Sequence, residues 1–370
     1  MNDPRPQCLA VADEDVAARV AATVRADVRA LRAYAVAKAD RMIKLDANES
    51  PHGLPEALRR KLAAALADVP LNRYPDGGAD AVRDALRATL RLPDEVALVL
   101  GNGSDEILQL ITTAVAEPGA VVVAPDPTFV MYRVYASHAR MRYVAVPLRK
   151  DLTLDCAAML AAIERERPAL VWLASPNNPT GTMFDPADVE RIVRAAPGLA
   201  VVDEAYVAYA SSEFLPRVLE FPNLVVVRTL SKVGMAGMRL GYAAAHPAWI
   251  AEIDKLRSPY NVGALTQAAA LVLLAEDALF AQQAAAVRAE RARLSSRLAA
   301  LPGVNVFPSE ANFVVARFPD AGATFTALRA AGILVKNVSG AHPLLANCLR
   351  ITVGTSPEND ALIAALDRRT

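Results

Sequence analysis

Short apolar runs alternate with longer stretches of helical periodicity between about Arg73 and His246. This alternation predicts parallel strands joined by helical crossovers. The predicted strands are VALVL (96–100), AVVVAP (120–125), RYVAVP (142–147), ALVWLA (169–174), LAVVDE (199–204), LVVVRT (224–229) and LGYAAA (240–245). Because these runs are apolar at nearly every position, we expect helices to cover both faces of one large sheet, as in an α/β fold.

The pattern changes after the predicted sheet. Between Gly263 and Pro302 there is no glycine or proline, and Ala and Leu dominate, which predicts one long helix or a broken helical pair. Beyond it, strand-like runs mixed with helical stretches predict a smaller α+β domain. The strand-like runs are ANFVVARF, ILVKNV and CLRITVG, and the helical stretches are near ATFTALRAAG and SPENDALIAALDRR.

We therefore expect three parts in the chain. Residues 1–45 form an N-terminal segment that packs with the small domain and contains the helix-like stretch DEDVAARVAATVRADVRALRAYAVAK. Residues 46–262 form the large domain, which contains the predicted sheet. Residues 263–370 form the connecting long helix and the small C-terminal domain.

Composition narrows the class of partner. Forty basic residues balance forty acidic ones, so no net charge favours nucleic acid, and a small-molecule ligand is the default. Cys8, Cys156 and Cys348 are too widely spaced for a disulfide framework or a metal site, and they favour a reducing, cytoplasmic setting. The N-terminus is not typical of a signal peptide. The most apolar later stretch is interrupted by Glu276 and Asp277, so we expect no membrane segment.

One candidate site is a glycine turn in VALVLGNGSDE, between a predicted strand and a predicted helix. Backbone N–H groups and the helix dipole favour a phosphate at such a turn. Glu106 stands where a dinucleotide fingerprint has its third glycine, which excludes a dehydrogenase of that type, and the P-loop lysine is absent. The alternative is a plain turn in which Ser104 or Asp105 caps the helix.

Two further strand ends carry polar side chains. In LASPNNPTG, prolines and a glycine fix the backbone around Asn177 and Asn178, at the sheet edge where open parallel sheets bind ligands. Asp203 ends an apolar strand, and a buried carboxylate needs a cation or several donors. It either pairs with a protein arginine or faces a ligand cation, and this stretch alone does not distinguish the two.

Lys232, one of only seven lysines, ends a strand-to-turn segment in RTLSKVGMAGMRLGY. Its amine is a nucleophile at neutral pH only if burial or positive charge lowers its pKa from about 10.4, and Arg228 and Arg239 are candidate neighbours. The alternative is a lysine that binds phosphate or caps a loop. Together the four strand ends offer a phosphate cradle, an amide donor, a carboxylate for a ring cation and a lysine, which are the parts that pyridoxal phosphate requires.

At these positions the chain resembles the fold-type I pyridoxal-phosphate aminotransferases, and more narrowly the histidinol-phosphate aminotransferases. The matching motifs run in order over nearly the whole chain: IKLDANESP, RYPDG, GNGSDE, DPTFVMY, SPNNPTG, VDEAY, RTLSK, AGMRLGY, ANFVVARF and CLRITVGT. The resemblance implies a large, mostly parallel sheet domain with helices on both faces, a smaller α+β domain, and a homodimer.

The resemblance also implies roles for individual residues. Lys232 would bind the cofactor covalently and move a proton, Asp203 would hold the ring nitrogen protonated, and Tyr206 would bind the ring 3-oxygen. The other cofactor-binding residues would be Asn178 at the same oxygen, Phe129 stacked on the ring, Gly103, Ser104, Asp105, Thr229, Ser231 and Arg239 around the phosphate, and Tyr74 from the second subunit. The substrate-binding residues would be Tyr34, Asn48, Asn178, Lys336 and Arg350.

The activity that the resemblance implies is amino transfer between L-histidinol phosphate and 2-oxoglutarate in histidine biosynthesis. An aromatic amino acid aminotransferase and a threonine-phosphate decarboxylase of the same fold are the alternatives. A regulatory protein that binds the cofactor is disfavoured, because no added helix-turn-helix module fits before Leu45. Two departures bear on the sites. The spacing from Lys232 to Arg239 is one residue shorter than in many relatives, and Lys336 stands where many carry arginine.

Overall fold

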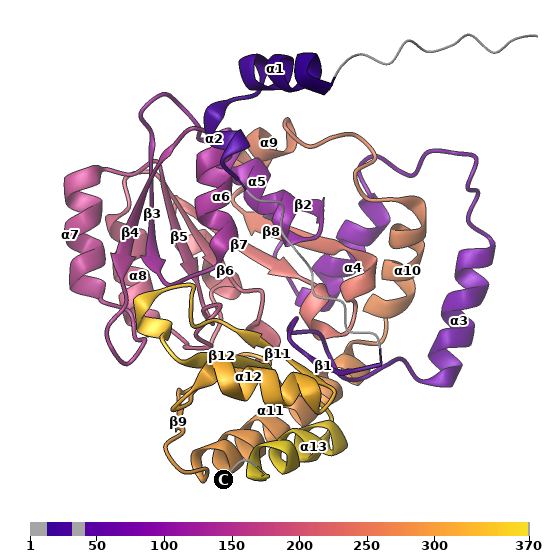
Figure 1. Ribbon diagram of the computed structural model, residues 1–370. Coiled ribbons are helices and arrows are strands. Elements are labelled where there is room, and N and C mark those ends of the chain that lie inside the picture. The colour runs from indigo at the N-terminus through magenta and orange to yellow at the C-terminus, as the bar shows by residue number, and fades with distance from the viewer. Residues whose placement is uncertain (1–12, 32–40, 369–370) are drawn as a thin grey trace, which may run out of the picture. The chain divides into compact units, whose positions relative to one another are not determined.

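The computed structural model describes residues 13–31 and 41–368 (Figure 1). Residues 39–370 form one compact unit, and the residues up to 38 form a separate one. In the separate unit, α1 (Asp13–Thr23) and α2 (Ala26–Arg29) lie within the stretch for which the sequence predicts helix. Three acidic residues in the first turn of α1 favour the helix, because they lie at the positive end of its dipole. Tyr34 lies outside the described residues.

The larger of two sheets in the compact unit has seven strands in the order β2-β8-β7-β6-β5-β3-β4. They are β2 (Ala97–Asn102), β3 (Val121–Asp126), β4 (Arg142–Pro147), β5 (Leu170–Ala174), β6 (Leu199–Asp203), β7 (Leu224–Thr229) and β8 (Leu240–Ala245). Each lies within two residues of its predicted range. Strands β3 to β7 pair in parallel, which confirms a mostly parallel sheet.

The expectation of parallel pairing is wrong for β8, which is antiparallel to both of its neighbours. Only residues 230–239 separate β7 from β8. A parallel neighbour needs a crossover of a dozen or more residues, so this short connection returns the chain in the opposite direction. The connection itself contains two short 3-10 turns, η3 (Ser231–Val233) and η4 (Ala236–Met238).

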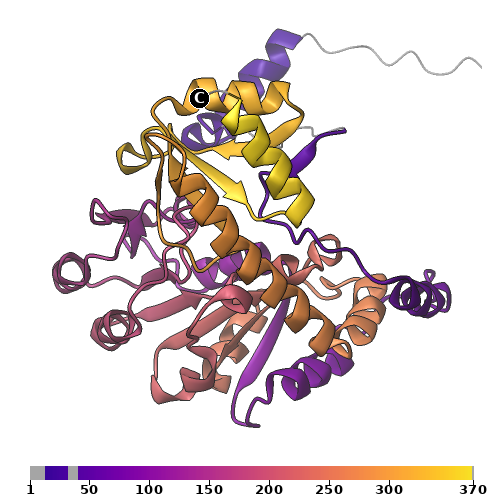
Figure 2. The same ribbon diagram turned by 90° about the horizontal axis from the view of Figure 1, so that it is seen from below.

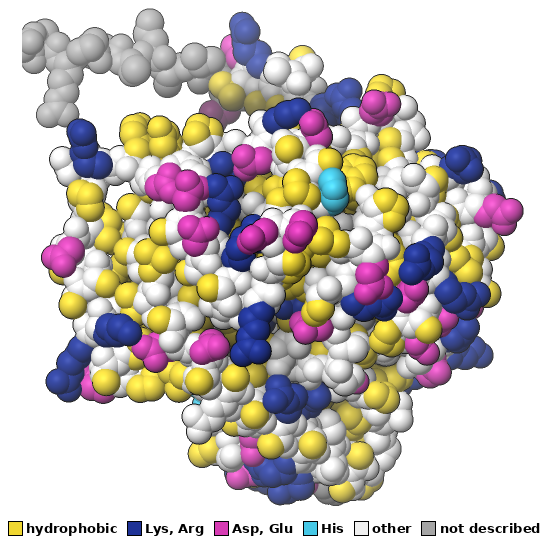
Figure 3. Space-filling model, turned by 180° about the vertical axis from the view of Figure 1, so that it is seen from behind, with side chains coloured by type: hydrophobic (Ala, Val, Ile, Leu, Met, Phe, Trp, Pro, Cys, Tyr) yellow, Lys and Arg dark blue, Asp and Glu magenta, His cyan; other side chains and the backbone are white. Residues whose placement is uncertain are grey.

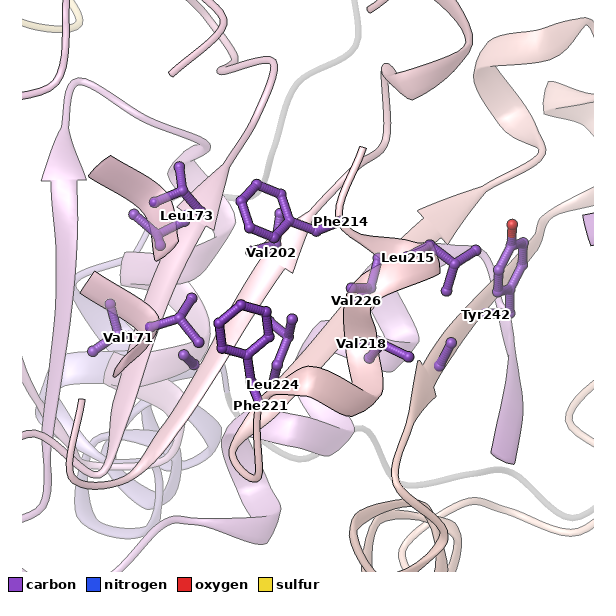
Figure 4. Packing of buried hydrophobic residues seen from close by; sticks show 14 of the residues in the cluster. Val171, Leu173, Val202, Phe214, Leu215, Val218, Phe221, Leu224, Val226 and Tyr242 are labelled. Atoms are coloured by element: carbon purple, nitrogen blue, oxygen red, sulfur yellow. The ribbon is translucent and has the colours of Figure 1, made fainter. Parts of the chain in front are cut away.

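Alternate residues of the central strands enter two separate apolar clusters, which explains why the strand sequences are apolar at every position. Val171 and Val202 pack on one face with Phe214 and Phe221, as Figure 4 shows, whereas Trp172 packs on the other face. Full burial of such a side chain stabilises the fold by roughly 1.5–3 kcal/mol. The first face is covered by α4 (Asp80–Leu90), α7 (Cys156–Glu166) and α8 (Pro186–Ala195), and the second by α5 (Ser104–Ala114), α6 (Val130–His138) and α9 (Pro247–Asp254).

The region between Gly263 and Pro302 is a broken helical pair, as one of the two sequence alternatives predicts. It consists of α10 (Ala264–Leu274), which packs on α3 (Glu56–Ala67), and α11 (Asp277–Ala299). Figure 2 shows α11 running from the small sheet toward the large one. Among the described residues no single helix is long and apolar enough to cross a membrane, although this pair, bent by 79°, has the length and composition to do so.

The second sheet has five strands in the order β1-β11-β12-β10-β9 and packs against α11. Its elements are β1 (Ile43–Leu45), β9 (Asn305–Val306), β10 (Phe313–Arg317), β11 (Ile333–Asn337) and β12 (Cys348–Thr352), with α12 (Ala321–Ala330) and α13 (Ser356–Asp367). They match the predicted α+β region. β1 pairs in parallel with β11, so a strand from early in the chain completes this sheet. The three-part division of the chain and the packing of residues 1–45 stay predictions.

Basic and acidic side chains are interspersed on the face of the molecule that Figure 3 shows. This distribution agrees with the equal numbers of basic and acidic residues in the sequence. Such a surface offers no strong single-sign field to steer a polyanion.

Candidate active site

The turn between β2 and α5 begins a helix that has no side-chain cap. Gly103 is the N-cap of α5, with a φ of 83°, and no side chain caps the helix. The alternative in which Ser104 or Asp105 caps the helix is therefore wrong. The first-turn N–H groups of a helix have no partner within the helix, so an uncapped N-terminus attracts anions.

The Arg239 guanidinium lies directly against this turn. A Cβ added to Gly103 would be 2.5 Å from Arg239 Nη2, so only glycine leaves room for the arginine there. Arg239 Nη1 donates to Ser231 Oγ over 3.2 Å, and Nη2 lies 3.6 Å from Asp105 Oδ2. Despite the short spacing from Lys232, the chain thus brings Arg239 to the glycine turn. We call Gly103, Ser104, Ser231 and Arg239 the anion cradle.

Thr229 lies behind the anion cradle and supports the turn that carries Ser231. Its hydroxyl accepts from the Ser231 backbone N–H over 3.2 Å and donates to the Leu240 carbonyl over 3.4 Å. The side chain is buried. These bonds fix the backbone on both sides of the connection between β7 and β8.

Lys232 lies in η3, one residue beyond the cradle's Ser231, and is half-buried. Its Nζ donates to the Ala47 carbonyl over 3.4 Å and lies 5.8 Å from the centre of the Tyr206 ring. The Lys232 carbonyl accepts from Tyr209 Oη at 2.5 Å, which holds the backbone of the turn. The lysine amine is therefore directed toward Tyr206.

The two carboxylates at the end of β6 have different partners. Glu204 forms an ion pair with Arg228 at 2.7 Å, and Arg228 also pairs with Glu213 at 2.5 Å. Although burial lowers it, these carboxylates hold the pKa of Arg228 above its ordinary value. Arg228 is thus engaged by two carboxylates.

Asp203 is buried and is bonded to neutral donors. Its Oδ2 accepts from Tyr132 Oη at 2.7 Å, and its Oδ1 accepts from the Ala205 backbone N–H at 3.0 Å. Burial raises the pKa of Asp203 to about 6, and the two hydrogen bonds act against that rise. In the described part of the chain the arginine alternative is therefore wrong for Asp203, because Arg228 pairs with its neighbour Glu204. The carboxylate can accept a cationic group of a ligand.

Tyr206 and Asn48 form a bonded pair between the two sheets. Asn48 Nδ2 donates to Tyr206 Oη at 3.0 Å, and both side chains are buried. The Asn48 backbone N–H donates to Thr352 Oγ1 at 3.0 Å, and its carbonyl accepts from Asn312 Nδ2 at 2.9 Å. Sequence reasoning assigned no role to Thr352 or Asn312, although both stand inside the quoted motifs LRITVGT and ANFVVARF.

The two asparagines of SPNNPTG divide their functions. Asn177 is fully buried and bonds to Thr128 and Thr180, so it fixes the loop itself. Asn178 Oδ1 instead accepts from Arg350 Nη1 at 2.7 Å. Only Asn178 of the pair is therefore available to a ligand at this edge.

Arg350 and Lys336 are cross-strand neighbours in the small sheet. They are directly paired in the antiparallel register of β11 and β12, so their side chains leave the same face. Arg350 Nη2 also donates to the Asp46 carbonyl at 2.8 Å. A phosphate or carboxylate bound at this face could contact both positive groups.

The structure places the two remaining aromatic candidates differently. Phe129 is the N-cap of α6 and packs edge to face on Tyr132, with 5.6 Å between ring centres. It thus lies beside the donor to Asp203. Tyr74 is 81% exposed and stacks on Tyr260, with 4.6 Å between ring centres. Within this chain, Tyr74 therefore packs on another surface ring and not on the aromatic residues around Asp203.

The residues present fit a ligand that combines a phosphate with a basic ring nitrogen. The anion cradle supplies a guanidinium, a hydroxyl and an uncapped helix N-terminus. Asp203 supplies a buried carboxylate that no described cation pairs with. Lys232 adds a half-buried amine next to Ser231 of the anion cradle, so the chemistry available is covalent binding of an aldehyde and proton transfer.

Comparison with known proteins agrees with this geometry. The sequence model of the family described as aminotransferase class I and II matches residues 40–366. The histidinol-phosphate aminotransferase of Chromobacterium violaceum is 56% identical over 345 residues, which cover 93% of this chain and 97% of that protein. Histidinol-phosphate aminotransferase 2 of Cupriavidus pinatubonensis is 51% identical over 362 residues, covering 96% of this chain and 98% of that protein.

Solved structures share the fold. The histidinol-phosphate aminotransferase of Sinorhizobium meliloti in complex with pyridoxal-5'-phosphate superposes with a TM-score of 0.80 at 27% identity, covering 94% of this chain and 97% of that one. The histidinol-phosphate aminotransferase of Clostridium acetobutylicum has a TM-score of 0.81 at 21% identity, covering 89% of this chain and 99% of that one. The second likeness supports the fold alone.

Proposed function

Because the chain belongs to the aminotransferase class I and II family, we propose that it transfers an amino group between L-histidinol phosphate and 2-oxoglutarate. The products are imidazole acetol phosphate and L-glutamate, and the reaction is a step of L-histidine biosynthesis. The observation that carries the proposal is an identity of 50% or more, over at least 93% of the chain, to curated relatives named for this activity.

Pyridoxal phosphate is the cofactor. When bound, it withdraws electrons from the substrate Cα and so stabilises negative charge on that carbon. We assign Lys232 Nζ to hold the cofactor covalently and to hold the proton that leaves the substrate Cα. The support for this role is position, because the half-buried amine faces Tyr206 and follows Ser231 of the anion cradle.

Asp203 would hold a proton on the ring nitrogen of the cofactor. A buried carboxylate that no described cation pairs with gains a strong charge-assisted hydrogen bond when such a nitrogen approaches. Tyr206 and Asn178 would donate to the ring 3-oxygen, and Phe129 would lie on the ring face. The anion cradle, with Asp105 and Thr229 supporting it, would bind the cofactor phosphate.

Substrate anions would bind at the cross-strand pair of Arg350 and Lys336. Histidinol phosphate brings a phosphate, and glutamate brings carboxylates, so both half-reactions need cations at one place. Arg350 already bonds to Asn178, which links this pair to the cofactor side of the site. Asn48 would close the same space through its bond to Tyr206, with Tyr34 as a further substrate contact.

We further propose that the protein is a cytoplasmic homodimer in which Tyr74 contributes to the partner's site. The support is exposure, because Tyr74, Leu71 and Tyr260 are large side chains that remain at the surface of one chain. Burial of these side chains between two copies would remove apolar area from water. Sedimentation equilibrium of the purified protein tests this, since a monomer at micromolar concentration would contradict it.

The test of the proposed activity uses purified protein loaded with pyridoxal phosphate. Incubation with L-histidinol phosphate and 2-oxoglutarate should produce L-glutamate. Turnover with phenylalanine but not with histidinol phosphate would instead identify an aromatic aminotransferase. Release of carbon dioxide from threonine phosphate, without any keto acid, would identify a decarboxylase.

A further inference from the structure

Tyr132 lies outside the roles described so far, yet it contacts the carboxylate at the end of β6. Its hydroxyl donates to Asp203 Oδ2 over 2.7 Å, and the side chain is fully buried. From this geometry we propose that Tyr132 is a positioning residue, which keeps Asp203 ionised and orients the carboxylate toward the ring nitrogen of the cofactor. The inference deepens the proposed function and rests on the role that it gives to Asp203.

The Tyr132 ring is fixed from two sides. It stacks on Trp172 with 4.7 Å between ring centres and an angle of 2° between the planes. Phe129 packs against it edge to face at 88°. Both Trp172 and Tyr132 are fully buried, and close packing leaves such rings one arrangement. The hydroxyl is therefore held at Asp203 rather than free to rotate away.

The same helix turn serves two parts of the proposed site. Phe129 and Tyr132 are three residues apart at the start of α6, a spacing that places side chains on one helical face. Phe129 would meet the face of the cofactor ring, and Tyr132 reaches the carboxylate that would meet its nitrogen. A single rigid turn thus sets the distance between the ring face and Asp203.

The hydrogen bond has an electrostatic consequence for the carboxylate. Burial raises the pKa of Asp203, and the charges of Asp105 on α5 and of Glu204, the next residue in the chain, act in the same direction. The Tyr132 hydroxyl and the Ala205 N–H act against the rise. Removal of the hydroxyl leaves the buried carboxylate with one donor of the two. Asp203 would then hold its own proton near neutral pH, and a neutral carboxylic acid stabilises a protonated ring nitrogen less well.

Tyr132 stays a donor over the whole working pH range. Burial and the neighbouring Asp203 raise the pKa of Tyr132 well above its ordinary value, and Tyr143 and Tyr206 act in the same direction. The phenol therefore carries its proton whenever Asp203 is ionised. The direction of the hydrogen bond is therefore fixed, with the Tyr132 hydroxyl donating and the Asp203 carboxylate accepting.

The test measures the pH dependence of unfolding by urea for the protein without cofactor. Asp203→Asn serves as the reference, because subtracting its stability isolates the titration of Asp203. The stabilising contribution of the protonated carboxyl falls as pH rises, and the fall ends once the pH passes the folded-state pKa, which is about 6 in the unmodified chain. We call the pH at which the fall ends the limit. For Tyr132→Phe, which keeps the stacked ring, we expect this limit to move up by roughly one to two pH units.

The matched control is Tyr135→Phe, which removes another buried phenol from the same helix. It should leave the limit in place. A uniform loss of stability at all pH values in Tyr132→Phe, with the limit unmoved, would show a structural role only and overturn the inference. So would an equal shift in the control.

A second measurement uses the loaded protein. The visible spectrum of the bound cofactor should titrate differently in Tyr132→Phe, with weaker cofactor binding, and Tyr135→Phe should match the unmodified chain. Failure of the proposed function is recognised separately, because it would appear as absent histidinol-phosphate turnover in the unmodified protein. An unchanged spectrum and affinity in Tyr132→Phe would contradict the positioning role even if that turnover is present.

Discussion

Replacement of Gly103 by alanine tests whether the anion cradle binds the cofactor phosphate. The new Cβ would lie 2.5 Å from Arg239 Nη2, so the guanidinium must move off the turn. A hydrogen bond to a charged group contributes about 1.5–3 kcal/mol, so loss of the Arg239 contact weakens cofactor binding roughly 10- to 100-fold. The alanine also adopts a φ near 83°, which costs stability about 1 kcal/mol or more.

The assay compares the affinity of the cofactor-free protein for pyridoxal phosphate with its affinity for pyridoxal, which lacks the phosphate. Gly103→Ala should lose affinity for the first and keep it for the second. Gly119→Ala is the matched control, because Gly119 has a φ of 82° but nothing within 4 Å of an added Cβ. It shares the backbone strain without displacing a side chain. Equal pyridoxal phosphate affinities in the two variants would refute the assignment of the cradle.

Three further predictions concern single groups of the proposed site. Lys232→Ala should abolish the visible absorbance of covalently bound cofactor and nearly all transamination while circular dichroism shows a folded protein; retained turnover contradicts its role. Because burial raises the pKa of Asp203 from 3.8 to about 6, the protonated carboxyl stabilises the fold below pH 3.8, and this contribution is lost as pH rises through 6. Urea unfolding of the cofactor-free protein should show a loss of about 3 kcal/mol over this range, and Asp203→Asn should not show it. Arg350→Lys replaces a fork by a point charge and should raise KM for both substrates roughly tenfold with a smaller change in kcat; an effect on kcat alone would place Arg350 elsewhere in the reaction.

The local pattern of apolar residues was sufficient to predict the strands of the large sheet. β7 and β8 match their predicted ranges because strands buried on both faces leave unbroken apolar runs. The direction of β8 could not be predicted from that pattern, since a run of apolar residues reads the same in both directions. The direction of β8 follows instead from the ten-residue connection, which is too short for a parallel crossover.

The candidate site was predictable in part for a similar reason. Asp203 ends one apolar strand and Lys232 lies in the turn after another, and polar residues at such positions can be recognised in a single sequence. Their partners are not. The Tyr132 to Asp203 bond joins residues 71 positions apart, and the Asn48 to Thr352 bond spans 304 positions. Such pairings depend on how distant elements pack, and local periodicity carries no information about that packing.

The choice between two partners for Asp203 shows where the missing information lay. Sequence reasoning left open whether the carboxylate pairs with a protein arginine or a ligand cation. The structure decides it through the adjacent residue, since Glu204 takes Arg228 while Asp203 turns to a phenol. Adjacent residues at the end of a strand point to opposite faces, so Glu204 and Asp203 meet different partners.

The parallel pairing of β1 with β11 has a consequence for synthesis of the chain. Ile43 pairs with Ile333, so the strand beside Asn48 waits for nearly three hundred further residues before its partner exists. Contacts of such wide separation form late, because closure of the intervening loop costs entropy before any contact is gained. A ribosome-bound chain can therefore assemble much of the seven-stranded sheet while Asn48 still lacks Thr352, and this bond of the candidate site forms only after residue 352 has been synthesised.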